Sequence, residues 1–92
     1  MVARITINMS SKGVLEIWLN PGGRDVLVKE LQALSETNDH FHLGPRWIGE
    51  VEVASVPYRS DDTLLEYGKV LFRTDEGDAK YFPHVMDQTV KP

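Results

Sequence analysis

The sequence contains no cysteine, so it can form neither a disulfide nor a thiolate metal site. Small secreted domains often depend on such crosslinks, and their absence therefore favours a reducing, cytoplasmic compartment. The N-terminal residues do not combine a basic segment with a following apolar one, so we predict no signal peptide. No apolar run approaches the roughly 20 residues that cross a bilayer, and we predict no association with a membrane.

Motifs of common catalytic and cofactor sites are also missing. Gly22-Gly23 lacks the spacing and the lysine of a phosphate-binding loop. Ser10-Ser11 lies outside a Gly-x-Ser-x-Gly context, so it does not indicate a nucleophile. The acidic runs do not follow the spacing of a calcium-binding loop. We therefore expect a protein that is not an enzyme and that needs no cofactor.

The two halves of the chain differ in charge. Residues 1–49 carry five basic and five acidic side chains, whereas residues 50–92 carry five basic and nine acidic ones, which accounts for the net charge of −4. An acidic surface repels phosphate backbones, and no basic stripe interleaved with aromatic residues is present. Nucleic-acid binding is thus disfavoured. The acidity serves either solubility alone or contact with a basic partner.

Ninety-two residues make one domain, which we place at residues 1–86, with a frayed tail at residues 87–92. Alternating apolar residues predict strands at 2–9 and 14–19, joined by a turn at 10–13. Further strands are predicted at 47–56 and 67–73, separated by a loop at 57–66. A turn at 75–78 precedes a short edge piece at 79–82. The predicted fold is α+β: one helix packed on a four- to five-stranded, mainly antiparallel sheet in the order ββαββ.

The predicted helix follows the second strand. Asn20 is a favourable N-cap, and Pro21 suits the first helical position. We expect the helix to end near residues 37–38. Its apolar stripe predicts a core face, with Leu31 near the centre of the core; the stripe comprises Leu27, Val28, Leu31 and Leu34.

Two histidines follow this helix, at His40 and His42. If this segment is extended, residues i and i+2 point the same way, so both imidazoles could share a metal with Asp39 or His84 as a third ligand. The competing interpretation places Phe41 in the core and the histidines in solvent. Zinc needs three or four ligands and the chain has three histidines in all, so we predict no stoichiometric metal.

Aromatic and acidic residues supply the other candidate binding positions. We expect Trp18 to lie in the core, and Trp47 to lie either in the core or on a contact surface. The predicted loop at 57–66 and its end carry further candidates, namely Tyr58, Asp61, Asp62 and Glu66.

The middle of the chain resembles a group of small bacterial proteins in which a Leu-x-x-Leu helix leads into an Asp-His-x-His-Leu turn, followed by a Trp and a Gly. The matching positions are Leu31, Leu34, residues 39–43, Trp47 and Gly49. Downstream, Ile48 separates the Trp from the Gly, and residues 49–53 do not align with the group. These proteins are similar to predicted immunity proteins encoded beside polymorphic toxins. The resemblance implies neutralisation of a toxin by stoichiometric binding.

We therefore expect a non-catalytic, cytoplasmic protein-binding module whose partner is another protein, such as a basic toxin. A small-molecule or metal-binding domain centred on His40 and His42 is the first alternative. A housekeeping homodimer joined through an open sheet edge is the second.

Overall fold

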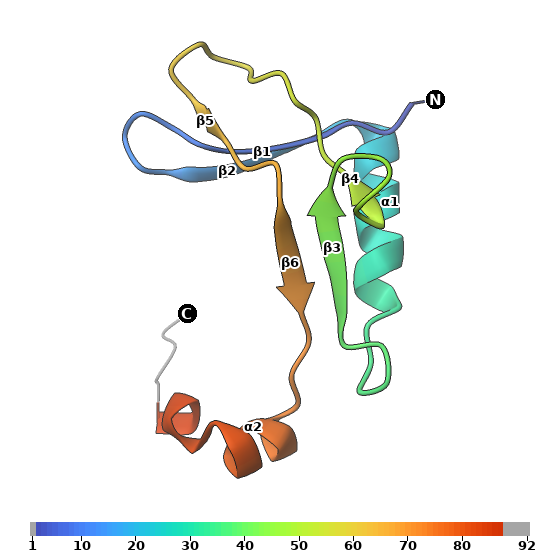
Figure 1. Ribbon diagram of the computed structural model, residues 1–92, viewed down its shortest axis with the longest axis vertical. Helices are drawn as coiled ribbons and strands as arrows, with labels where there is room; N and C mark the ends of the chain where they lie inside the picture. The colour runs from blue at the N-terminus through green and yellow to red at the C-terminus, as the bar shows by residue number, and fades with distance from the viewer. Residues whose placement is uncertain (1, 88–92) are drawn as a thin grey trace.

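The computed structural model describes residues 2–87, which form two small sheets, two α-helices and a terminal 3-10 helix (Figure 1). The predicted α+β class is confirmed. The predicted single sheet under one helix is not what forms, because the strands divide into two three-stranded sheets and a second helix follows them. The elements in chain order are β1 (Ile5–Met9), β2 (Leu15–Leu19), α1 (Pro21–Gln32), β3 (His40–Gly44), β4 (Val51–Glu52), β5 (Thr63–Leu64), β6 (Gly68–Leu71), α2 (Asp75–Tyr81) and η1 (Pro83–Asp87).

The first sheet has the strand order β2–β1–β5, with both pairings antiparallel. The predicted hairpin of β1 and β2 is present and runs from the pair Ile5–Leu19 to the pair Met9–Leu15. Its turn needs a glycine, because Gly13 has a φ of 80°. The third strand, β5, lies within the segment that was predicted to be a loop.

The second sheet has the order β4–β3–β6, in which β3 pairs parallel with β4 and antiparallel with β6. The strand predicted at 47–56 is reduced to β4, and the histidine segment itself forms β3. The histidine segment forms a strand because its side chains alternate between two sides: Phe41 is buried on one side, while His40 and His42 lie on the other. The strand predicted at 67–73 is present as β6.

The core lies where the two sheets and α1 meet. Its buried apolar side chains are Ile5, Ile7, Phe41, Val51 and Val53. A backbone hydrogen bond joins the two sheets, since the Ala54 amide, just after β4, donates to the Ile5 carbonyl at 2.7 Å. The Leu65 amide donates to the Ile7 carbonyl at 2.8 Å and extends the pairing of β1 with β5. The core is small, and both sheets contribute to it.

The start of α1 is fixed to the N-terminal strand by the predicted cap residue. The Asn20 side chain accepts hydrogen bonds from the Gly23 amide at 2.7 Å and the Arg4 amide at 2.8 Å, and its amide donates to the Val2 carbonyl at 2.8 Å. A Cβ on Gly23 would lie 2.2 Å from the Arg4 carbonyl oxygen. The glycine is therefore needed for close packing of the helix start against the segment that leads into β1.

The far half of α1 differs from the prediction. The helix ends at Gln32, about one and a half turns before the expected position, and the following chain turns at residues 35–38. Leu27 and Leu34 pack against the core as expected. Leu31, predicted near the centre of the core, is 46% exposed. The prediction for Leu31 is wrong because the core contacts only one flank of the helix.

The C-terminal segment is helical, although a turn and an edge strand were predicted there. Thr74 caps α2 by accepting a hydrogen bond from the Gly77 amide at 3.0 Å, and acidic residues occupy the first turn, where they meet the positive end of the helix dipole. None of the α2 or η1 residues is buried. Most of the tail predicted at 87–92 lies outside the described residues. No helix in the described part is both long and apolar enough to cross a membrane.

Candidate functional site

The strand β3 brings the two histidines of the sequence motif together. His40 and His42 lie on the same face of the strand, and their rings meet edge to face with centroids 5.0 Å apart. Both side chains are partly exposed. Phe41, between them, points to the opposite side and enters the core. One side of β3 therefore packs in the core, and the other side is accessible to a partner.

Each histidine is bound by its own carboxylate. The His40 Nδ1 lies 2.9 Å from Asp39 Oδ1, and the His42 Nδ1 lies 3.2 Å from Glu50 Oε1. The hydrogen bond with His40 lowers the pKa of Asp39 below its usual value, and the bond with His42 does the same for Glu50. The carboxylates hold the rings in fixed orientations and stay ionised to lower pH than free side chains.

The third metal ligand considered in the sequence is elsewhere. His84 packs edge to face against Phe82 in the C-terminal segment, with ring centroids 6.4 Å apart. Among residues 2–87, no group of three or more histidine and acidic side chains is placed to hold a metal ion. Each imidazole is instead paired with a separate carboxylate.

Strand β6 extends this surface. Its register places Leu71 opposite His40 and Lys69 opposite His42, so all four side chains share one face. An open hollow of about 300 Å³ adjoins them, lined in part by Ile48 and Tyr67. We call this surface the histidine face; it comprises His40, His42, Lys69, Leu71 and the rim residues Trp47, Ile48 and Tyr67.

The rim of the histidine face is formed by a tight loop that presents large apolar residues. The amides of Ile48 and Gly49 both donate to the Pro45 carbonyl, at 2.9 and 3.1 Å. A Cβ on Gly49 would come within 2.6 Å of the Gly44 nitrogen, so the loop requires a glycine there. Trp47, at the tip of this loop, is 83% exposed. Of the two alternatives for Trp47, the structure therefore supports the surface position.

A second cluster forms on the first sheet around Tyr58. Its ring stacks on Trp18 with centroids 4.2 Å apart and an angle of 11°, and the Arg59 guanidinium lies 5.4 Å from the Trp18 ring centroid. The Trp18 indole donates to Asn8 Oδ1 at 2.8 Å, and the Asn8 amide donates to Glu16 at 3.0 Å. Trp18 is thus partly buried beneath a surface loop, whereas the sequence predicted it in the core.

The acidic candidates in the same loop have different roles. Arg59 binds Asp62 through Nε, at 3.1 and 3.2 Å to its two oxygens, and also binds Glu16. The Asp62 side chain is only 1% exposed, and the hydrogen bond with Asp62 raises the pKa of Arg59. Asp61 and Glu66 are exposed. Asp62 therefore fixes the loop, and the other two acidic residues are available to a partner.

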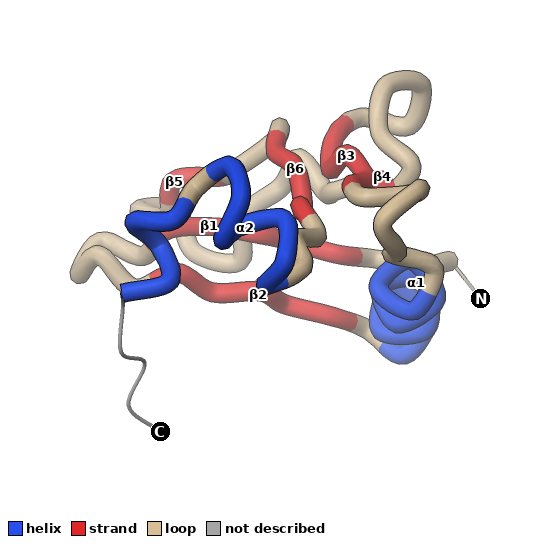
Figure 2. Tube along the Cα trace, turned by 90° about the horizontal axis from the view of Figure 1, so that it is seen from below, coloured by secondary structure: helices blue, strands red, loops and turns tan. Residues whose placement is uncertain are grey.

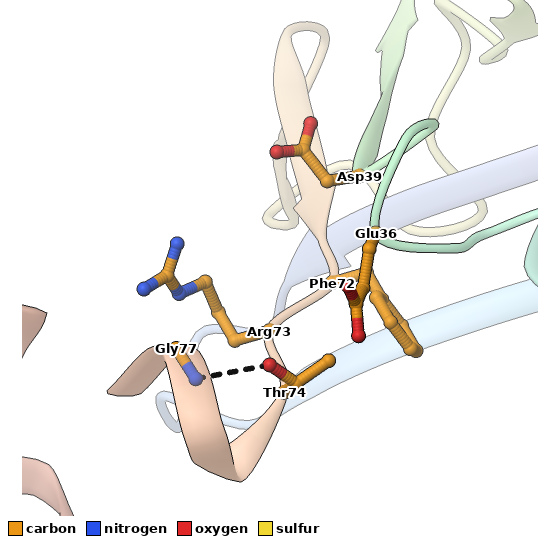
Figure 3. A pocket seen from close by; sticks show the side chains of 6 residues that line it. All are labelled: Glu36, Asp39, Phe72, Arg73, Thr74 and Gly77. Atoms are coloured by element: carbon orange, nitrogen blue, oxygen red, sulfur yellow. Dashed lines mark hydrogen bonds between the residues drawn. The ribbon is translucent and has the colours of Figure 1, made fainter. Parts of the chain in front are cut away.

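A small pocket connects the histidine segment to the start of α2 (Figure 3). In Figure 3 the Asp39 carboxylate and the Arg73 guanidinium extend to one side, with Glu36 and Phe72 on the other. Its volume of about 170 Å³ is below the range typical of metabolite sites, roughly 300–1,000 Å³. Arg73 is bound to Asp78 at 2.8 Å, so the pocket offers no free cation from that residue.

Sequence reasoning missed Asn8, Glu16 and Arg59 as members of a surface cluster. Asn8 could have signalled this cluster, because an asparagine that is buried in a strand requires a hydrogen-bond partner for its side-chain amide. Comparison of the chain with protein-family models, curated proteins and solved structures finds no match.

Proposed function

We propose that this protein is a cytoplasmic, non-catalytic binding module that neutralises a basic protein toxin by stoichiometric binding through the histidine face. The observation that carries the proposal is the exposure of Trp47, at 83%, next in the chain to Ile48, which lines the hollow together with Tyr67. Large aromatic side chains that stand free on a monomer are typical of interface hot spots, where they become desolvated on binding. The resemblance of residues 31–49 to immunity proteins supports the same role.

The charge of the second half supports a basic partner. Asp61 and Glu66 are exposed, and within the described part of the chain neither forms an ion pair. Opposite charge would chiefly accelerate association, and Trp47 would hold the complex once formed. The alternative of a metal or small-molecule site at His40 and His42 has less support, since each imidazole is already bound to a separate carboxylate.

The test is affinity capture from the source cell with the wild-type protein as bait, followed by binding kinetics with the captured partner. Trp47→Ala should weaken binding at least about 30-fold, as expected for loss of roughly 2 kcal/mol at a hot spot. Tyr81→Ala removes another exposed aromatic, on α2, and serves as the matched control. The double reversal Asp61→Lys, Glu66→Lys should slow association by about tenfold at low salt, and high salt should remove the difference.

Three results would contradict the proposal: no protein captured by the wild type, equal loss of binding in both aromatic variants, or capture of a partner that fails to suppress toxicity when the genes are co-expressed. One metal ion per chain, lost in His42→Ala, would favour the alternative.

A further inference from the structure

One face of β2 is apolar and uncovered. Leu15, Ile17 and Leu19 lie, by register, on the same face of the first sheet as Ile5 and Ile7. Ile5 and Ile7 on β1 are 2% and 8% exposed. On β2, the exposed fractions of Leu15, Ile17 and Leu19 are 56%, 52% and 41%. The apolar side of β2 is more exposed than its polar side, where Glu16 and Trp18 are half-buried. The apolar face of this sheet is therefore covered at β1 and uncovered at the neighbouring strand β2.

The helix that follows β2 also carries exposed apolar side chains. Val28 and Leu31, spaced i and i+3 on one flank of α1, are 43% and 46% exposed. Figure 1 shows α2 at the far end of the long axis from β1 and β2, so the C-terminal segment does not cover them. We call this surface the uncovered apolar face; it comprises Leu15, Ile17, Leu19, Val28 and Leu31.

The surface area of the chain measures how much is left uncovered. The chain exposes 7140 Å², whereas a compact monomer of 10.4 kDa exposes about 5,400 Å². Six residues lie outside the described part, and six fully extended residues expose about 950 Å². At least about 800 Å² per chain is therefore in excess. The radius of gyration, 15.4 Å, also exceeds the value of about 12 Å for a compact domain of this length.

This excess belongs to the whole described chain, the unburied α2 and η1 included. A twofold pair that buried all of it would form an interface of about 1,600 Å², the size of a stable protein complex, and the uncovered apolar face would supply the part around β2 and α1. All five residues of the uncovered apolar face lie in residues 1–49, the half with five basic and five acidic side chains. A neutral apolar surface suits a second copy of the same chain, because a twofold axis would otherwise bring like charges together. We propose that the protein forms a twofold-symmetric homodimer through the uncovered apolar face.

The dimer leaves the acidic second half free, so this proposal goes beyond the proposed function and can fail independently of it. Sedimentation velocity of the full chain across the micromolar range tests it. The wild type should sediment at twice its 10.4 kDa mass. Ile17→Lys should raise the dimer dissociation constant roughly 100-fold or more, because the dimer would bury an unpaired charge. Val56→Lys, at a site 73% exposed outside this face, should leave the dimer intact.

A milder change covers the case in which Ile17→Lys fails to fold. The chain has no cysteine, so Ile17→Cys and Val56→Cys each introduce a single thiol. The Ile17→Cys thiol should react with a maleimide at least about tenfold more slowly in concentrated than in dilute protein, because interface cores exclude water. The Val56→Cys rate should not depend on concentration. A wild type that stays monomeric throughout, a dimer that survives Ile17→Lys, or thiol rates without concentration dependence would overturn the proposal. A monomer whose Ile17→Lys variant loses the toxin would assign the face to the toxin instead.

Discussion

Strands β1 and β2 have the same alternating pattern, pair with each other along their full length, and differ in what covers them. In β1, which lies between β2 and β5, both faces are buried: Ile5 and Ile7 on one side, Thr6 and Asn8 on the other. In β2, at the edge of the sheet, the apolar side is exposed. Alternation thus identifies which residues share a face, but the position of a strand in the sheet decides whether that face is covered.

The second lesson concerns the polar side of the same two strands. There the loop that carries Tyr58 and Arg59 covers Trp18, and Asn8 supplies the acceptor for the indole. The loop contributes an aromatic ring and a cation in place of apolar side chains. A strand face with polar residues is therefore not always a solvent face, and in this sheet it is the better covered side of β2. Figure 2 shows β2 running beside β1 at the edge of the sheet.

The largest expected effect comes from truncating a buried residue of β1, compared with an exposed residue on the same face of β2. Ile5→Ala should reduce the free energy of unfolding by about 2–5 kcal/mol, because it leaves a cavity in the core. Ile17→Ala, at the equivalent face of β2, should cost less than about 1 kcal/mol, since the side chain is already half exposed. Urea denaturation at protein concentrations low enough to favour the monomer measures both. Equal losses would show that the single chain covers both strands equally.

An intermediate effect is expected on the polar side of β1, where Asn8 is hydrogen-bonded and the Thr6 hydroxyl has no partner in the described part of the chain. Asn8→Ala should reduce the free energy of unfolding by about 1–3 kcal/mol, because the partly buried Trp18 indole loses its acceptor. Thr6→Val should be neutral or slightly stabilising, since the buried Thr6 hydroxyl has no hydrogen-bond partner among residues 2–87. Thermal melting of both variants beside the wild type provides the measurement. A strongly destabilised Thr6→Val protein would contradict the assignment of the unpaired hydroxyl.

The smallest effect concerns the second sheet, whose outer face is polar and exposed. Glu50 has a pKa below its usual value because of its hydrogen bond with His42. A carboxyl whose folded pKa is depressed stabilises the fold above its unfolded pKa, about 4.3, and loses this contribution as the pH falls through the folded value. Glu50→Gln should therefore be slightly less stable than the wild type at pH 5, and the difference should shrink as the pH falls further. A difference that is unchanged at pH 3 would show that the ionised carboxylate is not its source.

The parts of the fold that were predictable depend on short-range rules. The β1–β2 hairpin follows from alternation and from Gly13, and the start of α1 follows from Asn20 and Pro21. Strand β3 was missed because polar residues precede it and Gly44-Pro45 ends it, so its five residues resembled a loop. Helix α2 was missed because its acidic residues and Gly77 are also typical of turns. The cap at Thr74 is the signal that distinguishes the two.

The candidate site was predictable in part for the same reason. Local spacing was enough to place His40 and His42 on one face, and in the structure their ring centroids are 5.0 Å apart. The pairing of Arg59 with Glu16 and that of His42 with Glu50 were not predictable, because Glu16 lies on a distant strand and Glu50 follows a loop whose shape depends on Gly49. Whether Leu31 enters the core depends on how α1 sits against the two sheets, which its own stripe does not specify.

The hydrogen bonds of Asn20 also have a consequence for the order in which the chain folds. They join Asn20 to Arg4, only 16 residues away, and to Val2 and Gly23. The hairpin and the helix start can therefore form from a continuous stretch of chain with little loop-closure entropy. The pairing of Asn8 with Leu64 closes a much longer loop. One side chain thus links the hairpin to the helix start through contacts that are short in sequence, whereas the contacts of the second half must close longer loops.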